Sequence, residues 1–175
     1  MRFFLLILGS ILIVSLQLTW LPKLAVLTIT PNLILAGVLA FAICQKEEKN
    51  FWWAMIPILL FDLLAGRPFG VFTLSACLMF FSLELLSNIF FKKNDLLALL
   101  LLAVVGVLFF EVYQFLLVEV FSIWRLIEPI KLSVFYFSVA LPIKVFYNGL
   151  LSLLGLLIIR KSQLLFSHGQ IFKIK

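Results

Sequence analysis

The chain has 175 residues, of which 65% are hydrophobic and 13% are charged, and its formal net charge is +6. A soluble globular domain is closer to half apolar and a quarter charged, and a protein of this size has too much surface to bury so large an apolar fraction. The composition therefore argues against an ordinary water-soluble domain and predicts an integral membrane protein, with the lipid bilayer as the solvent for much of its surface.

Six apolar segments follow one another along the chain. Their expected bounds are 3–21, 24–44, 51–65, 71–91, 96–120 and 132–159. Because a helix needs about 20 apolar residues to cross a bilayer, the pattern predicts an all-α, polytopic protein with six transmembrane helices. They form a single domain, residues 1–160, which is followed by a basic cytoplasmic tail, residues 161–175. The second segment is interrupted at Thr30-Pro31, so it is either one crossing or a re-entrant segment that begins only at Pro31.

The basic residues fall mainly at the edges of the apolar segments, where they anchor helices and set their orientation. Lysine and arginine are more frequent on the side of the membrane that carries the N-terminus, which predicts that both termini face the cytoplasm. No basic stripe or recognition motif is present, so we expect no nucleic-acid partner. The first segment lacks a small-residue cleavage site and is interpreted as a retained helix.

Ionisable and amide side chains inside the apolar segments are expected to meet in the protein interior, because they are costly in lipid. The helical rise of about 1.5 Å per residue places Glu84, Glu111 and Lys144 at similar depths. We expect Lys144 to pair with Glu111 or Glu84, with Gln114 and Asn148 completing the polar contacts. A proton or substrate path is the alternative, but no chain of acids and histidines crosses the bilayer.

The stretch "LLFDLLAGRPFG", residues 59–70, places a carboxylate just before a short turn. Gly66 and Gly70 permit the backbone to reverse, and Pro68 stiffens the connection. Near the end of its helix, Asp62 can reach either Arg67 across the turn or the backbone N–H groups at the start of the next helix.

The residues that enzymes use do not occur in a catalytic pattern. The lone histidine, His168, lies in the tail, no G-x-S-x-G or P-loop is present, and no two intramembrane aspartates face each other. We therefore predict no catalytic residues, no metal site and no cofactor. Small residues at Ala36, Gly37 and Ala40 instead predict a close approach between helices.

The order of these features resembles the rod-shape-determining protein MreD family. The resemblance rests on "TPNLILAGVLAFAI", residues 30–43, and on "LLFDLLAGRPFGVFTLSACLMFF", residues 59–81, and it covers about residues 1–95. The positions that match the family pattern are Pro31, Asp62, Gly66, Pro68, Phe69 and Gly70. Asn32 stands where the family commonly has aspartate.

The resemblance implies a non-enzymatic component of the bacterial elongation complex in the cytoplasmic membrane, which supports cell shape and sidewall peptidoglycan synthesis. The implied partners are MreC-like and MreB-like proteins and RodA with its transpeptidase. The family fold is also similar to the six-helix substrate-binding subunits of energy-coupling-factor vitamin transporters, which is the alternative function. The outward loops show no evident polar-aromatic pocket, and the first helix has no Ala-x-x-x-Ala motif, which favours the scaffold.

Overall fold

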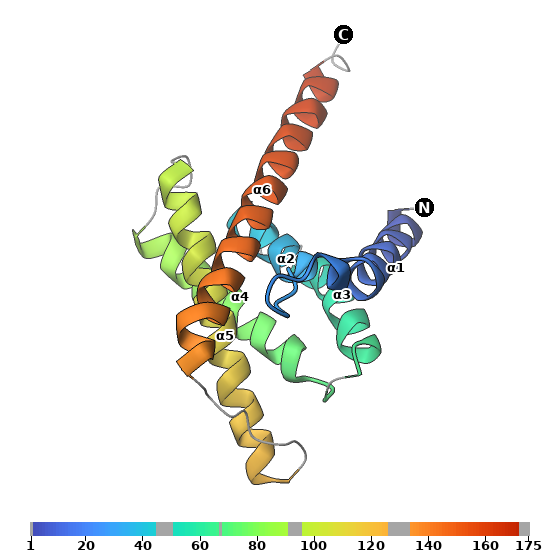
Figure 1. Ribbon diagram of the computed structural model, residues 1–175. Helices are drawn as coiled ribbons and strands as arrows, with labels where there is room; N and C mark the ends of the chain where they lie inside the picture. The colour runs from blue at the N-terminus through green and yellow to red at the C-terminus, as the bar shows by residue number, and fades with distance from the viewer. Residues whose placement is uncertain (1, 45–50, 67, 91–95, 126–133, 172–175) are drawn as a thin grey trace.

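The computed structural model describes residues 2–44, 51–66, 68–90, 96–125 and 134–171 (Figure 1). Its helices are α1 (Arg2–Thr19), α2 (Leu33–Cys44), α3 (Phe51–Leu64), α4 (Val71–Phe90), α5 (Leu96–Ile123) and α6 (Leu141–Ile171). A 3-10 turn, η1 (Leu21–Leu24), follows α1, and a π-helical turn, η3 (Tyr136–Ala140), leads into α6. These residues contain six α-helices and no strand, so the predicted all-α class with six helices is confirmed.

Most of the expected helix bounds agree closely with the structure. The bounds of α1, α3 and α4 lie within two residues of the apolar segments, and α5 continues three residues further, to Ile123. The last helix differs more, because α6 runs on to Ile171, through residues that were expected to form a separate tail. Figure 1 shows this end of α6 extending beyond the other helices.

The second segment is not one long helix, which corrects the expected span of 24–44. Only Leu33–Cys44 is α-helical. Proline has no N–H to donate and disfavours a helical residue before it, so α2 cannot extend back through Pro31. Before the proline, Val26 and Ile29 form an isolated bridge around a tight turn, in which Leu27 and Thr28 have φ values of 50° and 69°.

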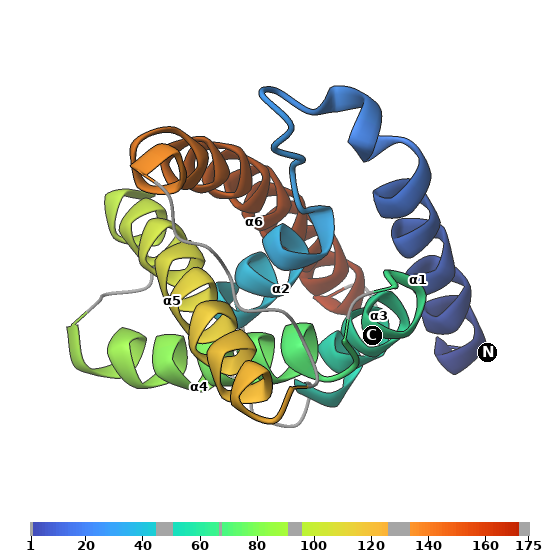
Figure 2. The ribbon, with the colours of Figure 1, turned by 60° about the horizontal axis from the view of Figure 1, so that its bottom comes forward.

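The short helix α2 occupies the centre of the molecule. It contacts each of the other five α-helices, and Figure 2 shows them arranged around it. Its side chains Leu35 and Leu39 are buried in the main apolar cluster. Within that cluster, Phe72 packs edge to face against Phe61 and Phe110, with ring centroids 4.8 and 5.0 Å apart. The core is therefore built around α2, and the N-terminus of this helix lies close to the middle of the fold.

Two helical stretches are long and apolar enough to cross a membrane, Ala98–Ile123 and Tyr136–Ile159. The remaining apolar helices are shorter. These stretches are Ile7–Thr19, Leu33–Ile43, Ala54–Leu64 and Val71–Leu86.

Candidate functional site

The N-terminus of α2 is bound by side-chain amides from three parts of the chain. Asn32 caps the helix, and its Oδ1 accepts a hydrogen bond from the Leu35 N–H at 3.0 Å. Gln17 of α1 accepts from the Leu33 N–H at 2.7 Å, and Asn148 of α6 accepts from the Asn32 N–H at 2.8 Å. Because the first N–H groups of a helix have no partner within it, these amides take the place of water.

Gln17 also forms a hydrogen bond with the backbone of Pro31, which precedes α2. Its Nε2 donates to the Pro31 carbonyl at 3.0 Å while its Oε1 accepts from Leu33, so one side chain bridges the break before α2. Gln17 and Asn148 are 6% and 2% exposed. Buried backbone polar groups must be paired to avoid a large cost, and these contacts therefore tie α1 and α6 to the start of α2.

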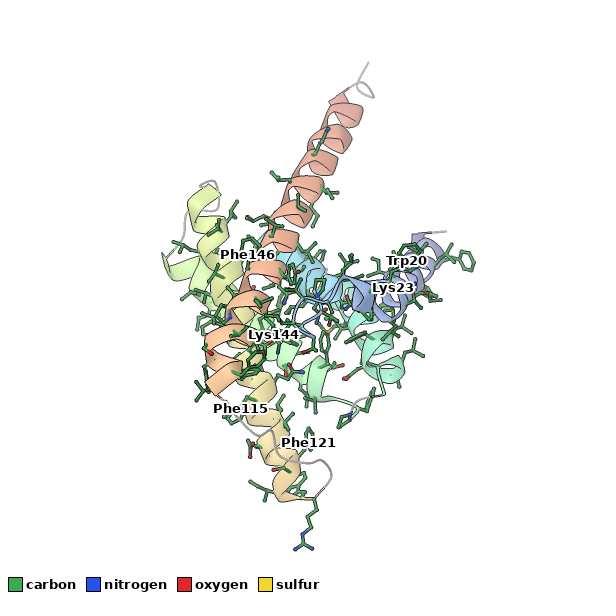
Figure 3. The ribbon with its side chains drawn as sticks, viewed as in Figure 1. Trp20, Lys23, Phe115, Phe121, Lys144 and Phe146 are labelled. Carbon is green, nitrogen blue, oxygen red and sulfur yellow. The ribbon has the colours of Figure 1, made fainter. Side chains whose placement is uncertain are left out.

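A second polar group consists of an ion pair between α5 and α6. Lys144 Nζ lies 2.7 Å from Glu111 Oε2, and the Tyr136 hydroxyl donates to the same oxygen at 2.5 Å. The ammonium also lies 5.1 Å from the centre of the Tyr136 ring. Figure 3 shows Lys144 near the middle of the molecule. Glu111 is 8% exposed, and the lysine and the tyrosine hydroxyl compensate its buried charge.

One cavity of about 300 Å³ connects these two polar groups. Gln17, Asn32 and Asn148 line it at the α2 end, and Glu111 and Lys144 line it at the other. The rest of the wall comes from the end of α1 and the chain between α1 and α2, from Gln114 of α5 and from apolar side chains of the core. These residues are Leu18, Pro22, Thr28, Ile29, Thr30, Leu35, Phe61, Ala65, Phe72, Phe110 and Gln114. A polar and aromatic cavity is therefore present, contrary to the expectation from the short outward loops.

The structure brings together only part of the polar set that was expected around Lys144. Glu111 is its ion-pair partner, whereas Glu84 is half-buried on α4 and does not line the cavity. Gln114 lines the cavity, but its amide has no hydrogen-bond partner among the described residues. Asn148 does line the cavity, yet its amide oxygen binds the backbone of Asn32 rather than the ion pair. That corrects its expected role, because the start of α2 was not expected to lie here.

Asp62 acts as a helix cap for the following helix, α4. Its Oδ2 accepts from the Gly70 N–H at 2.9 Å, from the Thr73 N–H at 3.1 Å and from the Thr73 hydroxyl at 2.7 Å. The carboxylate is 2% exposed, and its Oδ1 is buried without a partner among the described residues. Of the two expected interactions, the structure contains the one with the N-terminus of α4. Arg67, the other expected partner, lies outside the described residues.

The turn before α4 has the backbone geometry that its glycines permit. Gly66 and Gly70 have φ values of 63° and 96°, a region that residues with a side chain rarely adopt. Pro68 lies exposed between them, and Phe69 is also exposed. The motif "FDLLAGRPFG" thus serves a structural purpose, since its turn places the N–H groups of α4 on the Asp62 carboxylate.

The small residues of α2 face two different ways. Ala36 and Ala40 are buried, and a Cβ added at Gly155 of α6 would lie 3.0 Å from the Ala40 Cβ, so α2 and α6 approach closely there. Gly37 is exposed and meets no atom within 4 Å at its Cβ position, which corrects its expected helix contact. It lines a second cavity of about 540 Å³, which is almost entirely apolar and lies between α1, α2, α3 and α6.

The cavity wall offers hydrogen-bond donors and acceptors beside apolar side chains. The described residues hold no group of three side chains that could bind a metal ion. Sequence reasoning missed Tyr136 and the connection Thr28–Thr30 as parts of the site. Gln17 was not assigned to the site either, although a glutamine inside an apolar helix is a signal for a buried polar contact.

Replacing Lys144 by methionine should destabilise the protein by about 1–3 kcal/mol, because the buried Glu111 carboxylate would keep only the tyrosine as a partner. The double variant Lys144→Met/Glu111→Gln removes both charges and should lose less stability than the single variant. The midpoint of thermal unfolding in detergent measures both effects. A double variant that unfolds at the same temperature as the single variant, or below it, would show that the pairing contributes nothing.

Replacing Asp62 by alanine should lower the free energy of unfolding by about 0.5–2 kcal/mol, because Gly70 and Thr73 lose their capping oxygen. Asp62→Asn keeps an acceptor at the same position and should retain more stability, so it is the matched control. Thermal unfolding in detergent separates the two variants. Wild-type stability in Asp62→Ala would rule out the capping role.

Comparisons with known proteins gave no match. No protein-family model matches the chain, and no curated protein and no solved structure matches it either. A function for this chain therefore has to follow from its own residues, contacts and cavities.

Proposed function

We propose that the chain is a polytopic membrane protein. The observation that carries this proposal is the large number of exposed apolar side chains around an apolar core that also contains buried polar groups. Leu85 and Phe146 are each 65% exposed, whereas Asp62, Glu111 and Asn148 are buried. Soluble monomers seldom expose large contiguous apolar surfaces, and a surrounding bilayer removes the cost of doing so.

The two long apolar stretches support the same proposal. Ala98–Ile123 and Tyr136–Ile159 have mean hydropathies of 2.3 and 1.7, yet only 33% and 22% of their most apolar parts are buried within the protein. The core helix of a soluble protein would be mostly buried. Lipid is the solvent that suits helices with this much exposed apolar surface.

The shorter helices can lie within a bilayer if they pack against neighbouring helices. With 12 residues, α2 is about 18 Å long and cannot cross the hydrocarbon alone. Irregular backbone at membrane depth is tolerated where protein or a cavity surrounds it, and the amides of Gln17 and Asn148 supply such surroundings before α2. We propose a six-helix bundle in the bacterial cytoplasmic membrane, with both termini in the cytoplasm.

Within that membrane, we propose that the protein is a non-enzymatic scaffold of the elongation complex. Support comes from the resemblance of residues 30–43 and 59–81 to the MreD family, and from the structural use that the fold makes of the same residues. Asp62 caps α4, and Asn32 caps α2. Proposed partners are MreC-like and MreB-like proteins and RodA with its transpeptidase, which together build sidewall peptidoglycan.

One observation favours the alternative function, a substrate-binding subunit of a vitamin transporter. The cavity between α2, α5 and α6 is large enough for a small ligand and carries both charged and aromatic groups. The cavity supports binding of a small molecule, but it is not evidence that the chain couples to an ATPase. The scaffold therefore remains the leading proposal.

Depletion of the protein in the bacterium that encodes it tests the scaffold directly. Rods should become wide or round, and pulses of a fluorescent D-amino acid should lose their sidewall pattern. Expression of the wild-type chain should restore both, and added vitamins should restore neither.

Two results would contradict the scaffold. Depleted cells that stay rod-shaped, with an unchanged pattern of wall insertion, would exclude a role in elongation. A growth defect that vitamins cure, without any change of shape, would favour the transporter subunit instead.

A further inference from the structure

The cavity of about 300 Å³ retains polar groups that the fold does not use. Within the described residues, Glu111 accepts both of its bonds on Oε2, and Lys144 donates only one of its three N–H groups. The Gln114 amide, half-buried in the cavity wall, has no partner among these residues. An acceptor, a charged donor and an amide therefore remain available to a molecule in the cavity.

The charges of the cavity wall balance each other. Lys144 and Glu111 contribute one charge of each sign, and amides already occupy the N–H groups of Asn32, Leu33 and Leu35 at the start of α2. A ligand with a net charge would add an uncompensated charge beside the buried Glu111 and the partly exposed Lys144, which is costly. A ligand without net charge can bind both ends of the pair and leave the balance intact.

Three aromatic rings form the apolar side of the cavity. Phe61, Phe72 and Phe110 all line it, but with exposed fractions of 6%, 1% and 2% only a small part of each ring can reach a molecule inside. Their edge-to-face packing holds the rings in fixed positions. Aromatic groups of this kind pack well against a flat ring. Pockets for small molecules usually combine such apolar walls with a few polar groups and have volumes of roughly 300–1,000 Å³.

The connection over the cavity carries backbone strain. Leu27 and Thr28 both have positive φ, although neither is glycine, and Thr28, Ile29 and Pro22 line the cavity. The two-residue turn between Val26 and Ile29 requires this geometry, which is unfavourable for residues other than glycine and asparagine. The strained segment thus lies where a bound molecule would contact it.

We propose that this cavity is a binding site for a small molecule with no net charge, with a flat ring and with both hydrogen-bond donors and acceptors. Gln114 and the free faces of the Lys144–Glu111 pair bind its polar groups, and the three phenylalanines contact its ring. The site goes beyond the scaffold function and does not depend on it, because all of its residues belong to this one chain.

Four indole compounds of similar size test whether the site prefers ligands without net charge. The experiment uses the purified full-length chain in detergent. Indole-3-acetamide is uncharged and tryptophan is zwitterionic, whereas indole-3-acetate is an anion and tryptamine is a cation. A compound that binds only the folded protein raises its unfolding temperature. The first two compounds should do so, and calorimetry should show them binding at least about tenfold more tightly than the charged pair.

Two variants locate the binding. Gln114→Leu removes an unused amide from the wall and should weaken binding of indole-3-acetamide by at least about tenfold, while the unliganded protein unfolds at the wild-type temperature. Ser122→Ala is the matched control, since Ser122 lies on the same helix but does not line the cavity. The Ser122→Ala variant should bind indole-3-acetamide with the affinity of the wild type.

Three results would overturn the proposal. One is the absence of any shift or heat of binding with all four compounds at millimolar concentration. Another is equally tight binding of the acetate or the amine. The third is full binding by Gln114→Leu, which would place the compounds elsewhere, such as the apolar cavity beside Gly37.

Discussion

The N-terminus of α2 lies partly buried near the middle of the molecule, beside a cavity, and much of the structure depends on how its N–H groups are satisfied. Amides from α1, from the cap itself and from α6 bind these backbone groups. A buried N–H without a partner would cost as much as a lost hydrogen bond. The packing of α1 and α6 on α2 is therefore determined by polar contacts as well as by apolar burial.

The same constraint creates the cavity. A helix that starts in the interior leaves room in front of its first turn, and the connection before Pro31 and the Lys144–Glu111 pair enclose that space. Polar groups within membrane helices usually face a protein interior or a cavity, and the polar groups of this chain that line the cavity fit the proposed membrane location in that respect. A scaffold and a ligand site are thus compatible in one chain, because partner proteins would contact the apolar exterior while a small molecule would occupy the polar centre.

Much of the fold could be predicted from apolar runs and their breaks, since helix length and turn residues are local properties. The helical rise per residue predicted that Lys144 lies near Glu111 or Glu84, and Pro31 indicated an interruption of the second apolar segment, just before the observed start of α2. Two features left no local signal. The Asn148–Asn32 contact joins residues 116 positions apart, and the positive φ values of Leu27 and Thr28 occur at residues that rarely adopt them. Thr28, Asn32 and Asn148 all line the cavity, so its presence could be seen only in the tertiary structure.

Hydrogen exchange at the start of α2 tests most directly whether these amides hold the structure together. Nuclear magnetic resonance of ¹⁵N-leucine-labelled protein in micelles can follow the Leu33 N–H, whose acceptor is Gln17. The account predicts slow exchange at Leu33 in the wild type, compared with the exposed Leu27, and loss of that protection in Gln17→Leu. Exchange at Leu33 as fast as at Leu27, or protection unchanged in the variant, would contradict it.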